Sequence, residues 1–212
     1  MNVLQAIRGR RAVRDFKLEP VAEGLLFQLI SAASWAPSAM NEQPWFFTIV
    51  TDQAVLDEIS SRSKTWMLQD LQAVPRPSHF RDILMHPDFD IFYNAPCLIV
   101  ISTNSKGPWM AEDGALAAQN LMLMATDLGL GSCWIGFAQG WLNTAEGHNL
   151  LNLLKGAFVV APIIVGHPRT EIPPVARKAP FVNWIGQRRM DGEYIEEPVL
   201  EGPGIYGAII HP

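Results

Sequence analysis

The amino-acid sequence predicts an α+β fold, and three observations carry that prediction. Helical patterns come first, and strand-like runs separated by further helical patterns follow them. Hydrophobic residues make up 49% of the 212 residues and charged residues only 17%, which allows a sizeable core. The chain shows no internal repeat and no low-complexity segment, and its length suits one domain with an extension.

The first third of the chain is expected to hold two helices, a rigid loop and a strand. These elements are expected over residues 3–7 and 21–35 (helices), 36–44 (loop) and 45–50 (strand). Apolar spacing indicates the helices, and Pro37 and Pro44 among small polar residues indicate the loop. The strand is rich in β-formers, and Thr51 or Asp52 can cap a helix that follows it.

The middle of the chain is predicted to be irregular before it becomes regular again. Residues 62–92 contain Pro75, Pro77, Pro87 and several aromatic residues, so we expect either a pocket-shaping lid or a plain surface connection. A continuous aliphatic run over 98–101 predicts a strand.

The longest helix is expected over residues 109–128, with Gly129 and Gly131 ending it before an extended segment that begins at Cys133. Another helix is expected to close over 150–154, ahead of a strand over 158–165. Pro162 within that strand indicates an edge or a bulge. Seven prolines from Pro168 onward predict a tail that either dangles or wraps another subunit.

Composition excludes several classes of protein. The net charge of -5 argues against a nucleic-acid binder. Residues 114–131 are apolar but contain Gln119, Asn120 and Asp127, so they predict a buried helix, and we expect no membrane span. Cys97 and Cys133 lack metal-ligand spacing, so we expect no metal, no disulfide framework and a reducing, cytoplasmic location.

Basic residues gather in two places of this acidic chain. They are Arg8, Arg10, Arg11, Arg14 and Lys17 near the start, and Arg169, Arg177, Lys178, Arg188 and Arg189 near the end. Such clusters indicate either a local anion site, such as one for a phosphate group, or scattered surface charge.

Two further motifs carry polar or glycine-rich chemistry. The loop over 36–45 offers Ser38, Asn41 and Gln43, which can bind the edge of a planar heteroaromatic such as an isoalloxazine, or make local turn bonds. The second motif is Gly-Leu-Gly-Ser-Cys-Trp-Ile-Gly over 129–136. It follows a helix, whereas a dinucleotide fingerprint follows a strand, so we exclude that interpretation.

These motifs in this order resemble the nitroreductase family of FMN-dependent flavoproteins. The residues that carry the resemblance are 10–16, Ala36-Pro37-Ser38 with Asn41, Gln43, Pro44 and Trp45, Asn94-Ala95-Pro96, 113–136, and Arg177-Lys178 with Val182-Asn183-Trp184. The resemblance covers roughly residues 3–185. It implies a central, mostly antiparallel sheet flanked by helices and an intertwined homodimer with FMN at the interface. We therefore expect an FMN-binding domain over 1–186 and an extension over 187–212 that wraps the partner.

The resemblance also implies roles for individual residues. Arg10, Arg11 and Arg177 would hold the FMN phosphate, and Arg14 would lie near the pyrimidine end of the ring. The remaining expected cofactor contacts are Ala12, Pro37, Ser38, Ala39, Asn41, Gln43, Trp134, Ile135 and Gly136, of which Ser38, Ala39 and Asn41 would reach the FMN of the other subunit. The family usually has serine at Ala12, so one hydroxyl contact, worth about 1 kcal/mol, is missing.

The expected activity is transfer of electrons from NADH or NADPH to a small acceptor, such as a nitroaromatic or quinone, by a ping-pong mechanism through flavin N5. The flavin carries the chemistry, so we name no catalytic side chain. Four aromatic residues either stack on the acceptor or pack in the core: Trp66, Phe89, Phe92 and Trp109. Alternatives are a specialised flavoenzyme of the same fold, either a reductive dehalogenase or a flavin-cleaving enzyme, and a non-catalytic FMN-binding or storage dimer.

Overall fold

The computed structural model describes residues 1–73, 78–104, 107–183 and 185. It divides into two compact units, residues 1–172 and 173–212. Residues 173–183 of the second unit contain no helix or strand. Trp184 and the expected extension over 187–212 lie outside the described residues, so the domain boundary at residue 186 stays a prediction.

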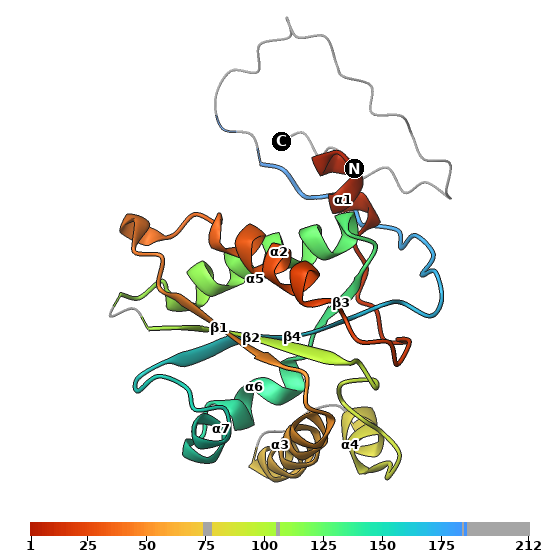
Figure 1. The fold of residues 1–212 in the computed structure, drawn as a ribbon, viewed down its shortest axis with the longest axis vertical. Coiled ribbons are helices and arrows are strands. Elements are labelled where there is room, and N and C mark those ends of the chain that lie inside the picture. Colours follow the sequence, from red (N-terminus) through yellow and green to blue (C-terminus); the bar gives the residue numbers. More distant parts are fainter. Residues whose placement is uncertain (74–77, 105–106, 184, 186–212) are drawn as a thin grey trace, which may run out of the picture. The chain divides into compact units, whose positions relative to one another are not determined.

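A four-stranded antiparallel sheet forms the centre of the first unit (Figure 1). Its order is β1 (Trp45–Val50), β2 (Cys97–Thr103), β4 (Phe158–Gly166) and β3 (Gly131–Trp134). Every neighbouring pair runs antiparallel. Helices flank this sheet, so the predicted α+β class with a central antiparallel sheet is confirmed.

Helices cover both faces of the sheet (Figure 1). One layer holds α1 (Val3–Gly9), α2 (Glu23–Ser34) and α5 (Met110–Asp127). The other holds α3 (Gln53–Ala73), α4 (Ser78–Met85), α6 (Gly136–Leu142) and α7 (Ala145–Leu150). Because both faces are covered, every residue of β2 is buried, which accounts for the aliphatic run in its sequence.

The two faces of β2 and β4 supply two separate cores. Leu98 and Val100 pack toward α3 and α6, whereas Ile99 and Ile101 pack toward α2 and α5. This alternation slips once in β4, where Val160 and Ala161 both join the second core. The slip coincides with a break in register opposite Ile101 and Ser102. A bulge at this point re-phases the strand.

Of the two alternatives that Pro162 indicates, the structure has the bulge, two residues away at Val160, and it excludes the edge. β4 pairs on both sides, with β2 and β3. Pro162 is tolerated because β3 ends at Trp134, so the missing N–H falls where that ladder stops. The Pro162 carbonyl still accepts a hydrogen bond from the amide of Ile135, at 2.8 Å.

The expectation of an irregular segment over 62–92 is also wrong. Most of it is helical, within α3 and α4. Pro87 follows the end of α4, and Pro75 and Pro77 lie between the two helices, in residues outside the description. Prolines here delimit helices, because a proline is disfavoured in a helix interior.

Local capping follows the sequence closely. The Asp52 carboxylate accepts hydrogen bonds from the amides of Ala54 and Val55 at the start of α3. Gly129 takes a left-handed φ of 71° just after α5, as expected of a helix-ending glycine. In the described part of the chain, no helix is long and apolar enough to cross a bilayer. Nor do its His, Cys, Asp and Glu side chains gather into a metal-binding group.

Candidate functional site

Residues 10–17, the arginine-rich segment, pair with the outer edge of β3 through an isolated bridge. Ala12 forms a parallel bridge with Ser132, and the Val13 amide donates to the Ser132 carbonyl at 3.0 Å. This close approach requires Gly131. A Cβ built on Gly131 would lie 2.8 Å from three carbons of Val13. Two motifs that are more than a hundred residues apart in sequence thus meet through one glycine.

The next residues of the segment, Phe16 and Lys17, pair with the chain that follows β4. Phe16 forms an antiparallel bridge with Pro168, and the Lys17 amide donates to the His167 carbonyl at 2.9 Å. Arg169 reinforces this pairing: its guanidinium donates to the Asp15 carboxylate at 3.1 Å and to the Phe16 carbonyl at 2.9 Å. The backbone on each side of Arg14 is therefore fixed, while its side chain is exposed.

Positive charge gathers beside β3. Burial raises the pKa of the Cys133 thiol, and the charges of Arg14 and Arg10 oppose that rise. Both guanidinium groups therefore act on the same point of β3 from the arginine-rich segment. Cys133 itself is a buried free thiol, as is Cys97. An anion beside this strand would meet two cations.

Arg11 points elsewhere. Its guanidinium donates to the carbonyls of Arg8 and Arg10, at the C-terminal end of α1. Cations near a helix C-terminus satisfy its last carbonyl groups. Arg10 follows α1 directly as its capping residue. The two adjacent arginines thus have different surroundings, and Arg11 is partly committed to the helix.

The glycine-rich motif ends in an open position. The Ile135 amide donates to Pro162, so it is not available to a ligand. Gly136 is the first residue of α6, where amides lack intrahelical partners. Gly136 is exposed, and apart from its chain neighbours and its own helix backbone no atom lies within 4 Å of the place where its Cβ would be. A planar group could therefore approach this backbone without meeting a side chain.

The polar loop over 36–44 is closed by its own side chains. The Gln43 amide nitrogen of the backbone donates to Ser38 Oγ at 2.9 Å, and the Gln43 side chain donates to Asn41 Oδ1 at 3.1 Å. Met40, Asn41 and Gln43 all have left-handed φ angles, between 50° and 55°. Such angles are disfavoured for residues with a Cβ and are more often found at functional sites.

One buried carboxylate anchors this loop. Asp113, in the first turn of α5, is 3% exposed and accepts a hydrogen bond from the Ala39 amide at 2.9 Å. The arginine-rich segment lies near the other end of α5, where Gly9 approaches Thr126. Thr126 comes thirteen positions after Asp113 in the helix, so the two residues are about 20 Å apart along its axis. Figure 1 shows these two ends of α5 at opposite ends of the layer that holds α1, α2 and α5.

The structure thus brings together Arg10, Ala12, Arg14 and Trp134 to Gly136, and it separates them from Pro37, Ser38, Ala39, Asn41 and Gln43. Arg177 belongs to the second unit and stays a prediction. Of the aromatic candidates, Phe92 is 1% exposed in the core and Trp66 packs against Gly140, whereas Trp109 is 53% exposed.

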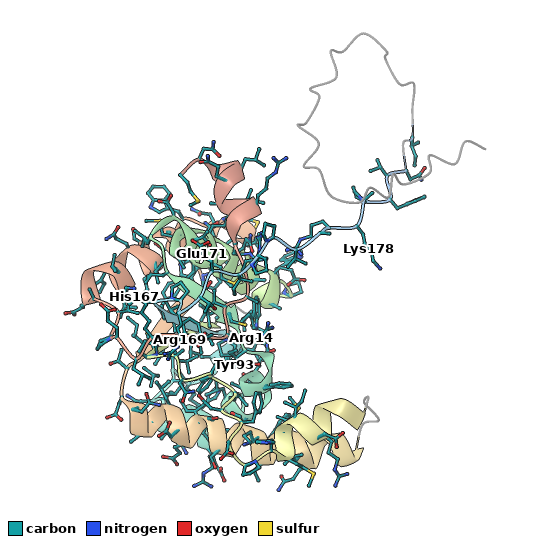
Figure 2. All side chains as sticks on the ribbon, turned by 90° about the vertical axis from the view of Figure 1, so that its right-hand side faces the viewer. Arg14, Tyr93, His167, Arg169, Glu171 and Lys178 are labelled. Atoms are coloured by element: carbon teal, nitrogen blue, oxygen red, sulfur yellow. The ribbon has the colours of Figure 1, made fainter. Side chains whose placement is uncertain are left out.

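Sequence reasoning named two residues that shape the site without predicting their roles. Asp113 appeared only within the 113–136 motif and anchors the loop, and Arg169 appeared only in the second basic cluster and holds the arginine-rich segment. Tyr93 was missed altogether. The Cζ atom of Arg14 lies 5.9 Å from the centre of its ring, and Figure 2 shows the two side chains together. The only sequence signal for Tyr93 is its position directly before the Asn94-Ala95-Pro96 motif.

Comparisons with known proteins point in one direction. The nitroreductase family profile matches residues 7–167. A protein from Methanothermobacter thermautotrophicus, provisionally named an NADH dehydrogenase/NAD(P)H nitroreductase, is 30% identical over 64% of this chain, and the match spans 61% of its own length. An iodotyrosine deiodinase from Thermotoga neapolitana is 31% identical over 58% of this chain and 67% of its own. The crystal structure of a Bacteroides fragilis nitroreductase with bound FMN superposes with a TM-score of 0.75, at 26% identity, over 88% of this chain and 100% of that one.

Proposed function

Because this chain belongs to the nitroreductase family of oxidoreductases, we propose that it binds FMN and uses NADH or NADPH to reduce small acceptors such as nitroaromatics or quinones. The observation that carries the proposal is the pairing of Ala12 and Val13 with Ser132, which brings the segment with Arg10 and Arg14 beside the glycine-rich motif and makes this edge of β3 cationic. When bound beside these residues, FMN would supply the transfer of two electrons from the nucleotide to an acceptor in the same place, in ping-pong order.

The residues present suit this cofactor. Arg10 supplies a permanent cation for the phosphate, with Arg177 as the predicted second ligand and Arg11 as a weaker one. Arg14 would lie at the pyrimidine end, where a cation favours the reduced, anionic ring. The open backbone at Gly136 leaves room for a planar ring, and the Gly136 amide stands in the first turn of α6, where amides lack intrahelical partners. Ala12 supplies no hydroxyl, so its contribution here is the backbone bridge to Ser132.

We further propose that the site is completed by a second copy of the chain. The loop with Ser38, Asn41 and Gln43 is anchored to Asp113 through the Ala39 amide. Asp113 lies about 20 Å along α5 from the end beside the arginine-rich segment. Two antiparallel copies would place the loop of one beside the cationic edge of the other. Trp35, just before that loop, is 84% exposed, and Met40, within it, is 88% exposed. Both side chains would be covered in such a dimer.

Anaerobic absorbance spectroscopy tests the activity. The purified protein should carry flavin absorbance that bleaches on addition of NADH or NADPH and returns when a nitroaromatic or quinone is added. A protein that bleaches with dithionite but with neither nucleotide would support a storage role instead. A protein that stays colourless after incubation with FMN would refute the proposal.

Unpaired cysteines fit a reducing compartment, and a cytoplasmic location is part of the proposal.

A second candidate is reductive dehalogenation, which the deiodinase relative favours. Iodide release from an iodinated phenol, measured with the reduced protein, distinguishes it. Release faster than reduction of a nitroaromatic would make dehalogenation the main activity, and absence of release would exclude it. Flavin cleavage, the other specialised alternative, would be detected as loss of flavin absorbance that oxygen does not restore.

A further inference from the structure

Arg14 has a fixed backbone but a long side chain that needs its own support. The Val13 amide is bonded to β3 and the Asp15 carbonyl accepts from the Arg169 amide at 3.0 Å, so the main chain is held on both sides. The guanidinium stands on four rotatable bonds and is exposed. Its position, and hence the potential that it creates at a bound ring, depends on what the side chain contacts.

Tyr93 provides that contact. The guanidinium of Arg14 lies over the Tyr93 ring, with Cζ 5.9 Å from the ring centre (Figure 2). A cation over an aromatic face is attracted by the π-electrons, and the planar guanidinium also packs well on a planar ring. Tyr93 is half-buried, so the ring is itself a firm platform.

The turn that presents Tyr93 has a disfavoured backbone conformation that several contacts hold in place. Tyr93 and Asn94 both adopt left-handed backbone angles, with φ of 55° and 56°. The Asp90 carboxylate accepts hydrogen bonds from the amides of Phe92 and Asn94, at 3.0 and 2.7 Å. The ring of Phe89 meets Tyr93 edge-on at 5.7 Å. A disfavoured conformation held by several bonds is typical of a functional position.

We propose that Tyr93 is a positioning residue that holds the Arg14 guanidinium at the pyrimidine end of the flavin and thereby sets the flavin's reduction potential. The inference rests on the proposed function, because it needs bound FMN. Without the aromatic platform, Arg14 would rotate into solvent, and the anionic reduced ring would lose a directed cation.

The protonation of Tyr93 suits this role. Burial raises the pKa of its hydroxyl, and the charge of Arg14 and the hydrogen bond between the two side chains only partly oppose that rise. The phenol is therefore neutral at physiological pH. A neutral ring orients the guanidinium without neutralising it, so the full positive charge remains available to the flavin.

The test is the midpoint potential of bound FMN in the dimeric holoprotein, measured by equilibration with a reference dye. Tyr93→Leu should shift the equilibrium about tenfold toward oxidised flavin, which is about 30 mV for two electrons. Tyr93→Phe keeps the ring and should stay within about threefold of the native protein. In an Arg14→Gln background, Tyr93→Leu should have no further effect, because the residue acts through Arg14.

Two controls separate this effect from misfolding. Leu29→Ala removes buried volume from the core on the other face of the sheet, and it should lower thermal stability but not the potential. If Tyr93→Leu does not fold, Tyr93→Met, which fills the space without a ring, takes its place. A native potential in the leucine or methionine variant, or an equal shift in the Arg14→Gln background, would overturn the inference. Absence of FMN from the native protein would instead overturn the proposed function.

Discussion

Replacing Gly131 with alanine is expected to disturb the site from a distance. The new Cβ would lie 2.8 Å from Cβ, Cγ1 and Cγ2 of Val13. Carbon atoms in contact normally stay about 3.5–4.0 Å apart, so the arginine-rich segment must move outward by about 0.7 Å or more. Overpacking of this kind costs about 1–3 kcal/mol. The same movement displaces Arg14, which follows Val13 directly.

The assay is thermal unfolding of the apo-protein at fixed concentration, followed by titration with FMN. A destabilisation of about 2 kcal/mol would lower Tm by about 4–8 °C in a chain of this size. We expect FMN affinity to fall about tenfold, or about 1.4 kcal/mol. Gly24→Ala is the matched control, because nothing lies within 4 Å of its Cβ position in α2, and alanine there should be neutral or stabilising. A Gly131→Ala protein with native Tm and native FMN affinity would refute the reasoning.

Three other predictions follow from the same structure. Asp113→Asn should lose about 1.5–3 kcal/mol of stability and open the loop over 36–44 to limited proteolysis, because the Ala39 amide loses a charged acceptor; an unchanged cleavage pattern would contradict the anchoring role. Burial raises the pKa of Cys97 to about 12, above its unfolded value of about 8.5. The stability that Cys97 contributes should therefore be fully present below that value and fall as pH rises from there toward 12, by up to about 1.4 kcal/mol per pH unit. In urea titrations Cys97→Ser should lose this part of the slope and keep the parts that Cys133 and Tyr93 contribute. Arg177→Ala should weaken FMN about ten- to a hundredfold but leave riboflavin unchanged in fluorimetric titrations, since riboflavin has no phosphate; equal losses for both ligands would remove Arg177 from the phosphate site.

Much of the fold could be predicted because local sequence decides it. The aliphatic run in β2 and the glycine after α5 each indicate their structure within a few residues. Residues 62–92 misled the prediction because prolines near helix ends look the same in sequence as prolines in a loop. The place of Pro162 in an interior strand depends on where β3 stops, which is decided some thirty residues earlier in the chain.

The candidate site was predictable only in part for a related reason. Arginine, serine and glycine motifs identify what could bind FMN, but their supports are distant in sequence. Arg169 holds Asp15 across 154 residues, and Asp113 holds Ala39 across 74. Tyr93 has no motif of its own and is found only through its ring beneath Arg14. Tertiary contacts of this kind leave no local periodicity to detect.

The central claim is that each FMN site combines the cationic edge of one chain with the loop of another. Subunit mixing tests it. Arg10→Ala/Arg14→Ala disables the edge, and Ser38→Ala/Asn41→Ala disables the loop, so each homodimer should bind FMN poorly. A mixed dimer, isolated with two different affinity tags, contains one site with both defects and one site with neither.

We therefore predict that the mixed dimer binds one FMN per two chains with native affinity, and that its flavin bleaches with the same nucleotide as the native protein. If edge and loop of the same chain formed the site, both sites of the mixed dimer would be defective. A mixed dimer that binds no more FMN than its two parents would therefore contradict the shared site.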